Sequence, residues 1–408
     1  MLSSIRADWV LPIAGPPLQG GSVTIEDGRI VAVEPTAPPG AINLGRRVLM
    51  PGLVNAHTHL ELSYLRGRIP RAARFTDWVR PLLAARQTPP DPAEVEACAT
   101  EAVGEAVESG TVLFGDVSNA LGVLSALRES RMAARVFYEL LGFNSSQPDA
   151  HVAEARVRVD AEQRAAADDG LEIRFSVAPH APYSVSPALF DAIGRDTRAH
   201  GSPTTVHLAE GQEEVQLLAD GTGPWRALLE TLGVWSDAWQ PPAASPVAYL
   251  QQRGFLNAAT LIVHGVQCTG ADIARVRDIG ATLVSCPRSN AYVGAGEPPL
   301  ADFYAAGVPV AFGTDSLASV ADLNLFSELA EARRLAPEVP ARRLLESATL
   351  IGARALGFER DYGSLEPGKR AALVSVGVPG GVTDVEEYLL SGLTTEMRCE
   401  MPFPPPQA

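Results

Sequence analysis

Long apolar runs are missing from this 408-residue chain, and no stretch approaches the roughly 18 consecutive apolar residues of a transmembrane helix. The chain start also lacks a basic segment followed by an apolar one, so we expect no secretory signal. Excess positive charge is absent as well: the net charge is −15. Because binding of phosphate groups needs a basic surface, this balance argues against a nucleic-acid partner.

Cysteine and lysine are both scarce. The four cysteines show no Cys-x-x-Cys spacing, which is typical of reduced thiols and favours a cytoplasmic location over a disulfide framework: Cys98, Cys268, Cys286 and Cys399. Of the 33 basic residues other than histidine, only Lys369 is a lysine. It lies in a β-like segment near the C-terminal end, which becomes relevant to the type of metal centre considered below.

Short apolar runs alternate with Ala/Glu/Arg-rich helical stretches, such as 92–108 and 154–169, through the middle of the chain. Eight runs have strand character: 51–57, 111–116, 134–140, 171–178, 204–207, 260–264, 281–285 and 308–315. Eight strands alternating with helices over about 300 residues predict an α/β fold, a (β/α)8 TIM barrel.

Both ends of the chain have β character. Residues 22–26 and 29–34 flank Asp27-Gly28, the pattern of a hairpin, and 363–376 is again strand-like. We therefore expect residues 1–50 and 360–408 to pair into a small β-sandwich domain beside a barrel of residues 51–359. An insertion near 219–252, rich in Trp and Pro, follows the fifth strand and either supplies aromatic walls at the barrel mouth or forms a surface excursion.

The first strand ends in His57 and His59, spaced i, i+2. Alternate side chains of a strand point the same way, so the two imidazoles are half of a metal site or two ordinary polar residues. Three further strands end at or just before His180, His207 and His264, and the last ends in Asp315. In a (β/α)8 barrel these ends converge on the catalytic face.

Three imidazoles and a carboxylate form a plausible ligand set: His57, His59, His207 and Asp315. The set suits one divalent ion, Zn²⁺ first and Fe²⁺ as the alternative, with a position open for water. A lysine-bridged pair of ions is excluded, since Lys369 lies in the expected β domain.

Each of three other residues near these strand ends has two possible roles. Glu210 is placed as a general acid/base or as a carboxylate at a helix start. His264 positions the attacking water or is a hydrogen-bonded histidine of the barrel mouth. His180, between prolines, contacts substrate or braces its loop.

Six motifs in order resemble the amidohydrolase superfamily, most closely its cytosine deaminase and chlorohydrolase-like branch, which includes adenosine-type and aminofutalosine deaminases. They are Pro51-Gly-Leu-Val-Asn-Ala-His-Thr-His, Pro179-His-Ala-Pro-Tyr-Ser-Val-Ser, His207-Leu-Ala-Glu, Val263-His-Gly, Ser285-Cys-Pro-Arg-Ser-Asn and Phe312-Gly-Thr-Asp-Ser-Leu-Ala-Ser. The resemblance implies one metal ion on His57, His59, His207 and Asp315. It also implies proton transfer by Glu210 and Asp315, water orientation by His264, and a substrate contact by His180.

Two segments depart from that pattern. Relatives often have His where this chain has Ser285, so Ser285 and Arg288 are candidates for setting substrate preference. Glu61 and Trp78 follow the first strand closely and are further candidates, although Glu61 can equally brace its loop.

The resemblance implies hydrolytic deamination of an amino-substituted heterocycle or an adenine-type nucleoside, with aminodeoxyfutalosine as a candidate substrate. The alternative is hydrolysis of another ring C–N or C–Cl bond. A non-catalytic scaffold predicts missing ligands, and none is missing. The expected partner is a small molecule, and a homodimer is left open.

Overall fold

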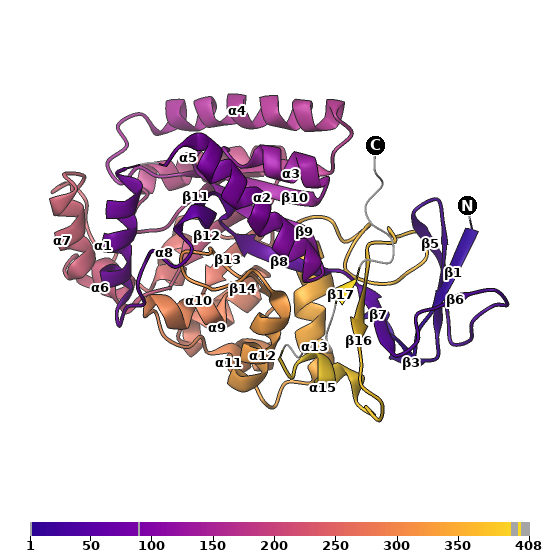
Figure 1. Cartoon of the computed structure of the whole chain (residues 1–408). Helices are drawn as coiled ribbons and strands as arrows, with labels where there is room; N and C mark the ends of the chain where they lie inside the picture. Colours follow the sequence, from indigo (N-terminus) through magenta and orange to yellow (C-terminus); the bar gives the residue numbers. More distant parts are fainter. Residues whose placement is uncertain (1, 89, 393–398, 401–408) are drawn as a thin grey trace.

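Eight parallel strands form the centre of the molecule (Figure 1). The computed structural model describes residues 2–88, 90–392 and 399–400. The central strands are β8 (Leu53–Thr58), β9 (Thr111–Ser118), β10 (Ala133–Leu140), β11 (Ile173–Pro179), β12 (Thr204–Leu208), β13 (Thr260–His264), β14 (Thr282–Ser285) and β15 (Val310–Phe312). Each overlaps one of the eight predicted runs, so the parallel α/β architecture is confirmed.

The strands pair in chain order within two sheets, β8-β9-β10-β11 and β12-β13-β14-β15. The sheets meet at both edges. On one side the His207 amide donates to the His180 carbonyl oxygen at 2.9 Å. On the other side the amides of Thr314 and Asp315 both donate to the His57 carbonyl oxygen at 3.1 Å. The barrel is therefore closed at the residues that carry its polar side chains.

Helices connect the strands and cover them. They are α1 (Phe75–Arg86), α2 (Pro92–Glu108), α3 (Leu124–Ser130), α4 (Pro148–Asp168), α5 (Pro187–His200), α6 (Gln212–Asp220), α7 (Pro224–Thr231), α8 (Pro246–Gln252), α9 (Gly270–Ile279), α10 (Pro287–Val293), α11 (Leu300–Ala306), α12 (Leu325–Leu335), α13 (Ala341–Glu346) and α14 (Gly352–Ala355). The short helices η1 (Leu60–Leu65) and η2 (Ser347–Ile351) add to these.

Proline and capping residues set where several helices begin. The predicted helix 92–108 coincides with α2, whose Asp91 side chain accepts a hydrogen bond from the Ala93 amide. Ser186 and Ser245 cap α5 and α8 in the same way. Each of these helices has proline in its first turn, where the missing amide hydrogen would have had no partner.

The first 51 residues form β1 (Leu2–Arg6), β2 (Trp9–Val10), β3 (Leu18–Gln19), β4 (Ser22–Glu26), β5 (Arg29–Glu34), β6 (Ile42–Asn43) and β7 (Arg47–Pro51). The predicted hairpin is present as β4 and β5, and its Asp27 and Gly28 both have positive φ, as a tight primed turn requires. β7 pairs antiparallel with β16 (Leu373–Gly377), so strands from both ends of the chain share one sheet. β17 (Cys399–Glu400) pairs with β16 in that sheet, and α15 (Val385–Leu389) lies between these two strands in the chain.

These end strands lie at one side of the barrel (Figure 1). They enclose a second buried apolar cluster, which includes Ile5, Val23, Leu49 and Leu373. Residues 393–398 and 401–408 of the expected C-terminal part lie outside the described residues.

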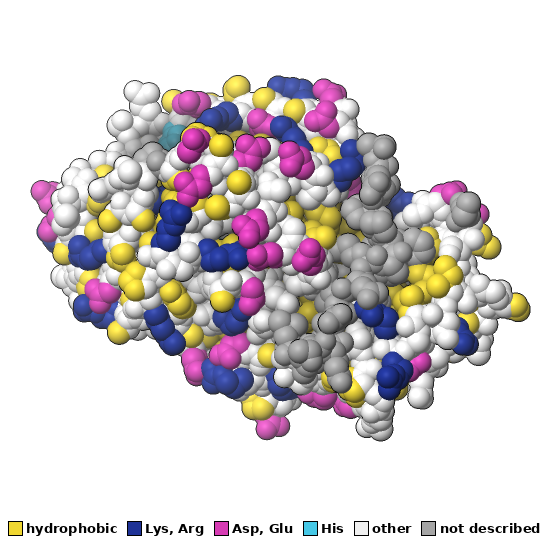
Figure 2. Space-filling model, in the orientation of Figure 1, with side chains coloured by type: hydrophobic (Ala, Val, Ile, Leu, Met, Phe, Trp, Pro, Cys, Tyr) yellow, Lys and Arg dark blue, Asp and Glu magenta, His cyan; other side chains and the backbone are white. Residues whose placement is uncertain are grey.

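The surface mixes both signs of charge: Figure 2 shows Arg or Lys side chains interspersed with Asp and Glu on the face drawn. Among the described residues, no helix has the length and apolar character needed to cross a membrane. The stretch 219–252 contains α7 and α8.

Candidate metal centre

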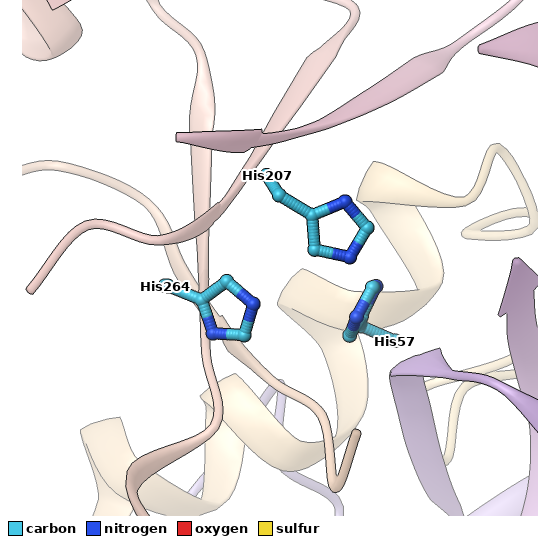
Figure 3. Close-up of side chains that lie close together, drawn as sticks. All are labelled: His57, His207 and His264. Carbon is cyan, nitrogen blue, oxygen red and sulfur yellow. The ribbon is translucent and has the colours of Figure 1, made fainter. Parts of the chain in front are cut away.

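The C-terminal ends of β8, β12, β13 and β15 bring five side chains together, and Figure 3 shows the rings of His57, His207 and His264 facing one another. Candidate ligand atoms of these three histidines lie within 4.8 Å of one another. The same limit holds for His57, His59 and Asp315. The His59 Nε2 atom lies 3.2 Å from His207 Nε2 and 3.9 Å from Asp315 Oδ1. All four predicted ligands are therefore in one cluster.

The donor set fits a divalent cation. The Nε2 atom of His57 is buried and has no hydrogen-bond partner within the described part of the chain. His207 Nδ1 lies 3.2 Å from the His180 carbonyl oxygen, which can only accept, so His207 presents a lone pair at Nε2 toward His59. A metal ion is the kind of partner that accepts such converging nitrogen lone pairs. We conclude that the site holds one divalent metal ion.

Burial keeps these imidazoles neutral. It lowers the pKa of His57 and His59 well below the usual value, and the neighbouring histidines lower both further. Burial and His180 lower the pKa of His207 to about 4. Neutral imidazole is the metal-binding form, so the histidines need not lose a proton near neutral pH.

Asp315 is fixed by two hydrogen bonds. Ser289 Oγ donates to its Oδ2 atom at 2.7 Å, and the Ser316 amide donates to its Oδ1 atom at 2.7 Å. Asp315 and His264 both have positive φ, 63° and 75°. Such backbone strain costs about 1–3 kcal/mol per residue and is typical of functional sites.

Glu210 lies beside His264, with its Oε1 atom 3.6 Å from His264 Nε2. Burial raises the pKa of Glu210 well above its usual value, and Asp315, Glu214 and Glu213 raise it further. Burial and the neighbouring carboxylates thus favour the protonated form of the Glu210 carboxyl group, which is the form that can donate a proton. His264 Nδ1 pairs with Asn290 Oδ1 at 2.8 Å, which fixes the proton on Nδ1 and leaves Nε2 as an acceptor.

An aromatic wall adjoins the cluster. The ring of Tyr183 lies edge-on to His180, with 5.5 Å between ring centres. Trp225, from α7, stacks on Tyr183 at 3.9 Å. The stretch 219–252 therefore contacts Tyr183, which itself packs on His180, and the expectation that it supplies aromatic walls at the barrel mouth stays a prediction. Trp235 and Trp239 of the same stretch pack on Phe143 instead.

Two other predicted substrate contacts, Glu61 and Arg288, are bonded to groups of the protein itself. Glu61 accepts hydrogen bonds from Ser118 Oγ and from the amides of Asn119 and Ala120. The Arg288 guanidinium binds Glu328 and Asp322. Both side chains brace loops in this structure, and their contact with substrate stays a prediction.

Trp78 and Ser285 are buried, and neither Trp78 Nε1 nor Ser285 Oγ has a hydrogen-bond partner within residues 2–88 and 90–392. His180 Nδ1 pairs with Ser184 Oγ at 2.6 Å, and its Nε2 atom is the one left for a ligand.

Sequence reasoning missed several residues of the site. Ser289 and Asn290 lie inside the quoted Ser285–Asn290 motif, but their partners Asp315 and His264 come from other strands. Glu139 is the last residue but one of β10, and its Oε1 atom lies 3.4 Å from His207 Nδ1. The position of Glu139 near the end of a predicted barrel strand could have identified it from the sequence.

A parallel α/β barrel whose strand ends carry a His/Asp metal cluster and a buried carboxyl group defines a metal-dependent hydrolase. The chain belongs to the Amidohydrolase family, whose model matches residues 48–391. It is an enzyme that hydrolyses carbon–nitrogen bonds, and the resemblance noted in the sequence is confirmed.

Three relatives illustrate the match. A 5-methylthioadenosine/S-adenosylhomocysteine deaminase of Moorella thermoacetica is 30% identical over 387 residues, covering 91% of this chain and 85% of its own. An aminodeoxyfutalosine deaminase of Deinococcus radiodurans is 32% identical, covering 78% of this chain and 76% of its own. A zinc-bound adenosine deaminase of Xanthomonas campestris has a TM-score of 0.80 and 29% identity, covering 95% of this chain and 88% of its own.

Proposed function

We propose that the protein is a zinc-dependent deaminase that replaces the ring amino group of an adenine-type nucleoside by oxygen and releases ammonia, with aminodeoxyfutalosine as a candidate substrate. The observation that carries the proposal is the buried Glu210 carboxyl group, 3.6 Å from His264 Nε2, beside the His57–His59–His207–Asp315 cluster. The three relatives described above are named as deaminases of adenine-type compounds, which supports the substrate class.

Zinc is the proposed ion, because neutral imidazoles with one carboxylate suit it and the Xanthomonas relative binds it. His57, His59, His207 and Asp315 would hold it. A zinc ion there lowers the pKa of a bound water to about 7, which supplies a nucleophile at neutral pH.

The chain's own residues handle the protons. Glu210 donates a proton to the ring nitrogen next to the carbon under attack. His264, oriented by Asn290, holds the attacking water through Nε2. Asp315, held by Ser289 and Ser316, takes a proton from that water and passes it to the departing amine. Water adds its oxygen to the ring carbon, the carbon–nitrogen bond breaks as ammonia leaves, and the proton remaining on the added oxygen returns to Glu210.

Ammonia release tests this proposal. The zinc-loaded protein is incubated with adenosine, 5-methylthioadenosine, S-adenosylhomocysteine, aminodeoxyfutalosine, adenine, cytosine and a chlorinated triazine. We expect release from nucleosides, and a 10²–10⁴-fold lower kcat in Glu210→Gln with zinc content unchanged. Turnover of free bases alone would contradict the nucleoside assignment, and chloride release without ammonia would replace deamination by halide hydrolysis.

The division of the chain is a second proposal. The end strands would form a small β-sandwich domain of residues 1–50 and 360–408, beside a barrel of residues 51–359. The separate apolar cluster that the end strands enclose supports this division into two domains. Leu373→Asp in that cluster is expected to lower thermal stability while zinc stays bound, and loss of zinc would contradict two units.

We also propose a cytoplasmic enzyme with a small-molecule substrate. Cell fractionation tests the location, and sedimentation tests whether it is a homodimer.

A further inference from the structure

The backbone at Glu210 makes a strained turn. Ala209, the residue before it, has a φ of 53°, in the left-handed region that a residue with a Cβ atom rarely adopts. The turn follows β12 directly and directs the Glu210 carboxyl group toward His264. Because this conformation costs about 1–3 kcal/mol, surrounding contacts must hold it in place.

Glu214, in the first turn of α6, reaches back to that turn. Its Oε2 atom accepts a hydrogen bond from the Glu210 amide at 3.0 Å, and the backbone amides of Ala209 and Glu210 both act to lower the pKa of the Glu214 carboxyl group against its burial. The Glu214 side chain is fully buried, and its other oxygen, Oε1, has no hydrogen-bond partner among the residues described.

Gln267 holds the opposite side of the same turn. Its backbone amide donates to the Ala209 carbonyl oxygen at 2.7 Å. Its side-chain Nε2 donates to the Glu210 carbonyl oxygen at 3.2 Å and to the Ala295 carbonyl oxygen at 2.7 Å. The polar backbone groups on both sides of the strained turn are thus occupied.

Burial of a carboxyl group lowers the stability of the fold, because the group loses its contacts with water. Neither Arg nor Lys is paired with Glu214 in the ion pairs of the described residues. Its hydrogen bonds to the turn are therefore its evident use, and they need only an acceptor oxygen, which the amide of glutamine also offers.

We propose that Glu214, assisted by Gln267, is a positioning residue that holds the Glu210 turn in its strained conformation and so directs the Glu210 carboxyl group toward the reacting ring. The inference rests on the role proposed for Glu210. It predicts that loss of the Glu214 acceptor lowers catalysis only through Glu210 and loosens the amides of residues 209 and 210.

The first measurement does not involve activity. Hydrogen–deuterium exchange of the segment containing Ala209 and Glu210 is compared in wild type, Glu214→Gln and Glu214→Leu. We expect faster exchange in Glu214→Leu and near wild-type exchange in Glu214→Gln. Glu213→Gln is the matched control: this neighbouring buried carboxylate binds Thr76 instead, so exchange at 209–210 should not change. Unchanged exchange in Glu214→Leu would overturn the proposal.

The second measurement is a double-mutant cycle on kcat, with zinc content and KM followed. Glu214→Leu is expected to lower kcat roughly 10–100-fold in the wild-type background and not at all in Glu210→Gln. Equal losses in both backgrounds would show a general structural role and overturn the proposal.

If Glu214→Leu does not fold, Gln267→Leu takes its place, with the same expected non-additivity. If wild type releases no ammonia from any compound, the proposed function fails, and the exchange measurement still decides whether Glu214 holds the turn.

Discussion

Asp315 is the proposed ligand whose protonation is expected to control metal binding. In the metal-free protein, burial raises its pKa to about 6 against the hydrogen bonds from Ser289 and Ser316. The His207 pKa is lowered to about 4. A ligand must be deprotonated to bind, so as the pH falls protons compete first at Asp315 and only later at His207.

Zinc affinity is therefore expected to be nearly constant above about pH 6, to fall about tenfold per pH unit between about 6 and 4, and to fall more steeply below. Competition with a chromophoric chelator between pH 4.5 and 8 measures this. Asp315→Asn, which cannot titrate, should bind more weakly with no slope between pH 5 and 6. A wild-type affinity that is flat down to pH 5 would contradict this assignment.

At the residue level, the sequence predicted side chains whose partners lie in the same motif or at equivalent strand ends. The five clustered histidines and Asp315 were visible because barrel topology alone brings strand ends together. Glu139 was not predicted, because it lies against His207, which only folding brings near. Glu214 was not predicted although its partner, the Glu210 amide, is four residues away, because the residue types do not reveal the strained turn between them. Arg288 was visible as a charge, but its partners Asp322 and Glu328 follow in the chain by more than 30 residues.

Gly313, directly after β15, permits the close approach of this strand to β8. A Cβ atom at position 313 would lie 2.7 Å from both the Cβ atom and the carbonyl oxygen of His57. Overpacking of this kind costs about 1–3 kcal/mol and here would displace a metal ligand.

Gly313→Ala is therefore expected to lower both the free energy of unfolding and zinc affinity, the latter by at least roughly tenfold. Gly104→Ala is the matched control, because an added Cβ atom meets open space there, inside α2. We expect it to stabilise the fold by about 0.5–1 kcal/mol and to leave zinc affinity unchanged. Denaturant unfolding and metal titration of both variants check this. Equal zinc affinity in the two would contradict the role given to Gly313.

At the element level, periodicity and turn residues predicted the eight strands, α2 and the β4–β5 hairpin. Boundaries were less well predicted: α4 begins at Pro148 rather than near residue 154, because proline starts a helix readily. The positive φ of His264 and Asp315 was not predictable, since nothing in the residue types requires it.

The proposed ligands lie at the ends of β8, β12 and β15, so we expect one ion to link both sheets of the barrel. An ion that binds only the folded protein stabilises it by about 4 kcal/mol at a thousandfold excess over Kd. For a chain of this size, removal of the ion is expected to lower Tm by on the order of 5–10 °C.

Differential scanning calorimetry with and without a chelator measures the change in Tm. In Asp315→Asn, which binds the ion weakly, the chelator should have a much smaller effect. An unchanged Tm in wild-type protein that had held stoichiometric zinc would show that the ion does not contribute to the stability of the barrel.

Closure of the barrel at His57 and Asp315 also has a consequence for biosynthesis. These residues lie near opposite ends of the barrel sequence, and the stretch between them takes on the order of 10–50 s to translate. During that time the nascent chain exposes His57 and His59 without the carboxylate that completes their site. With the proposed ligand set, we therefore expect tight capture of the ion only in chains that have been translated past Asp315.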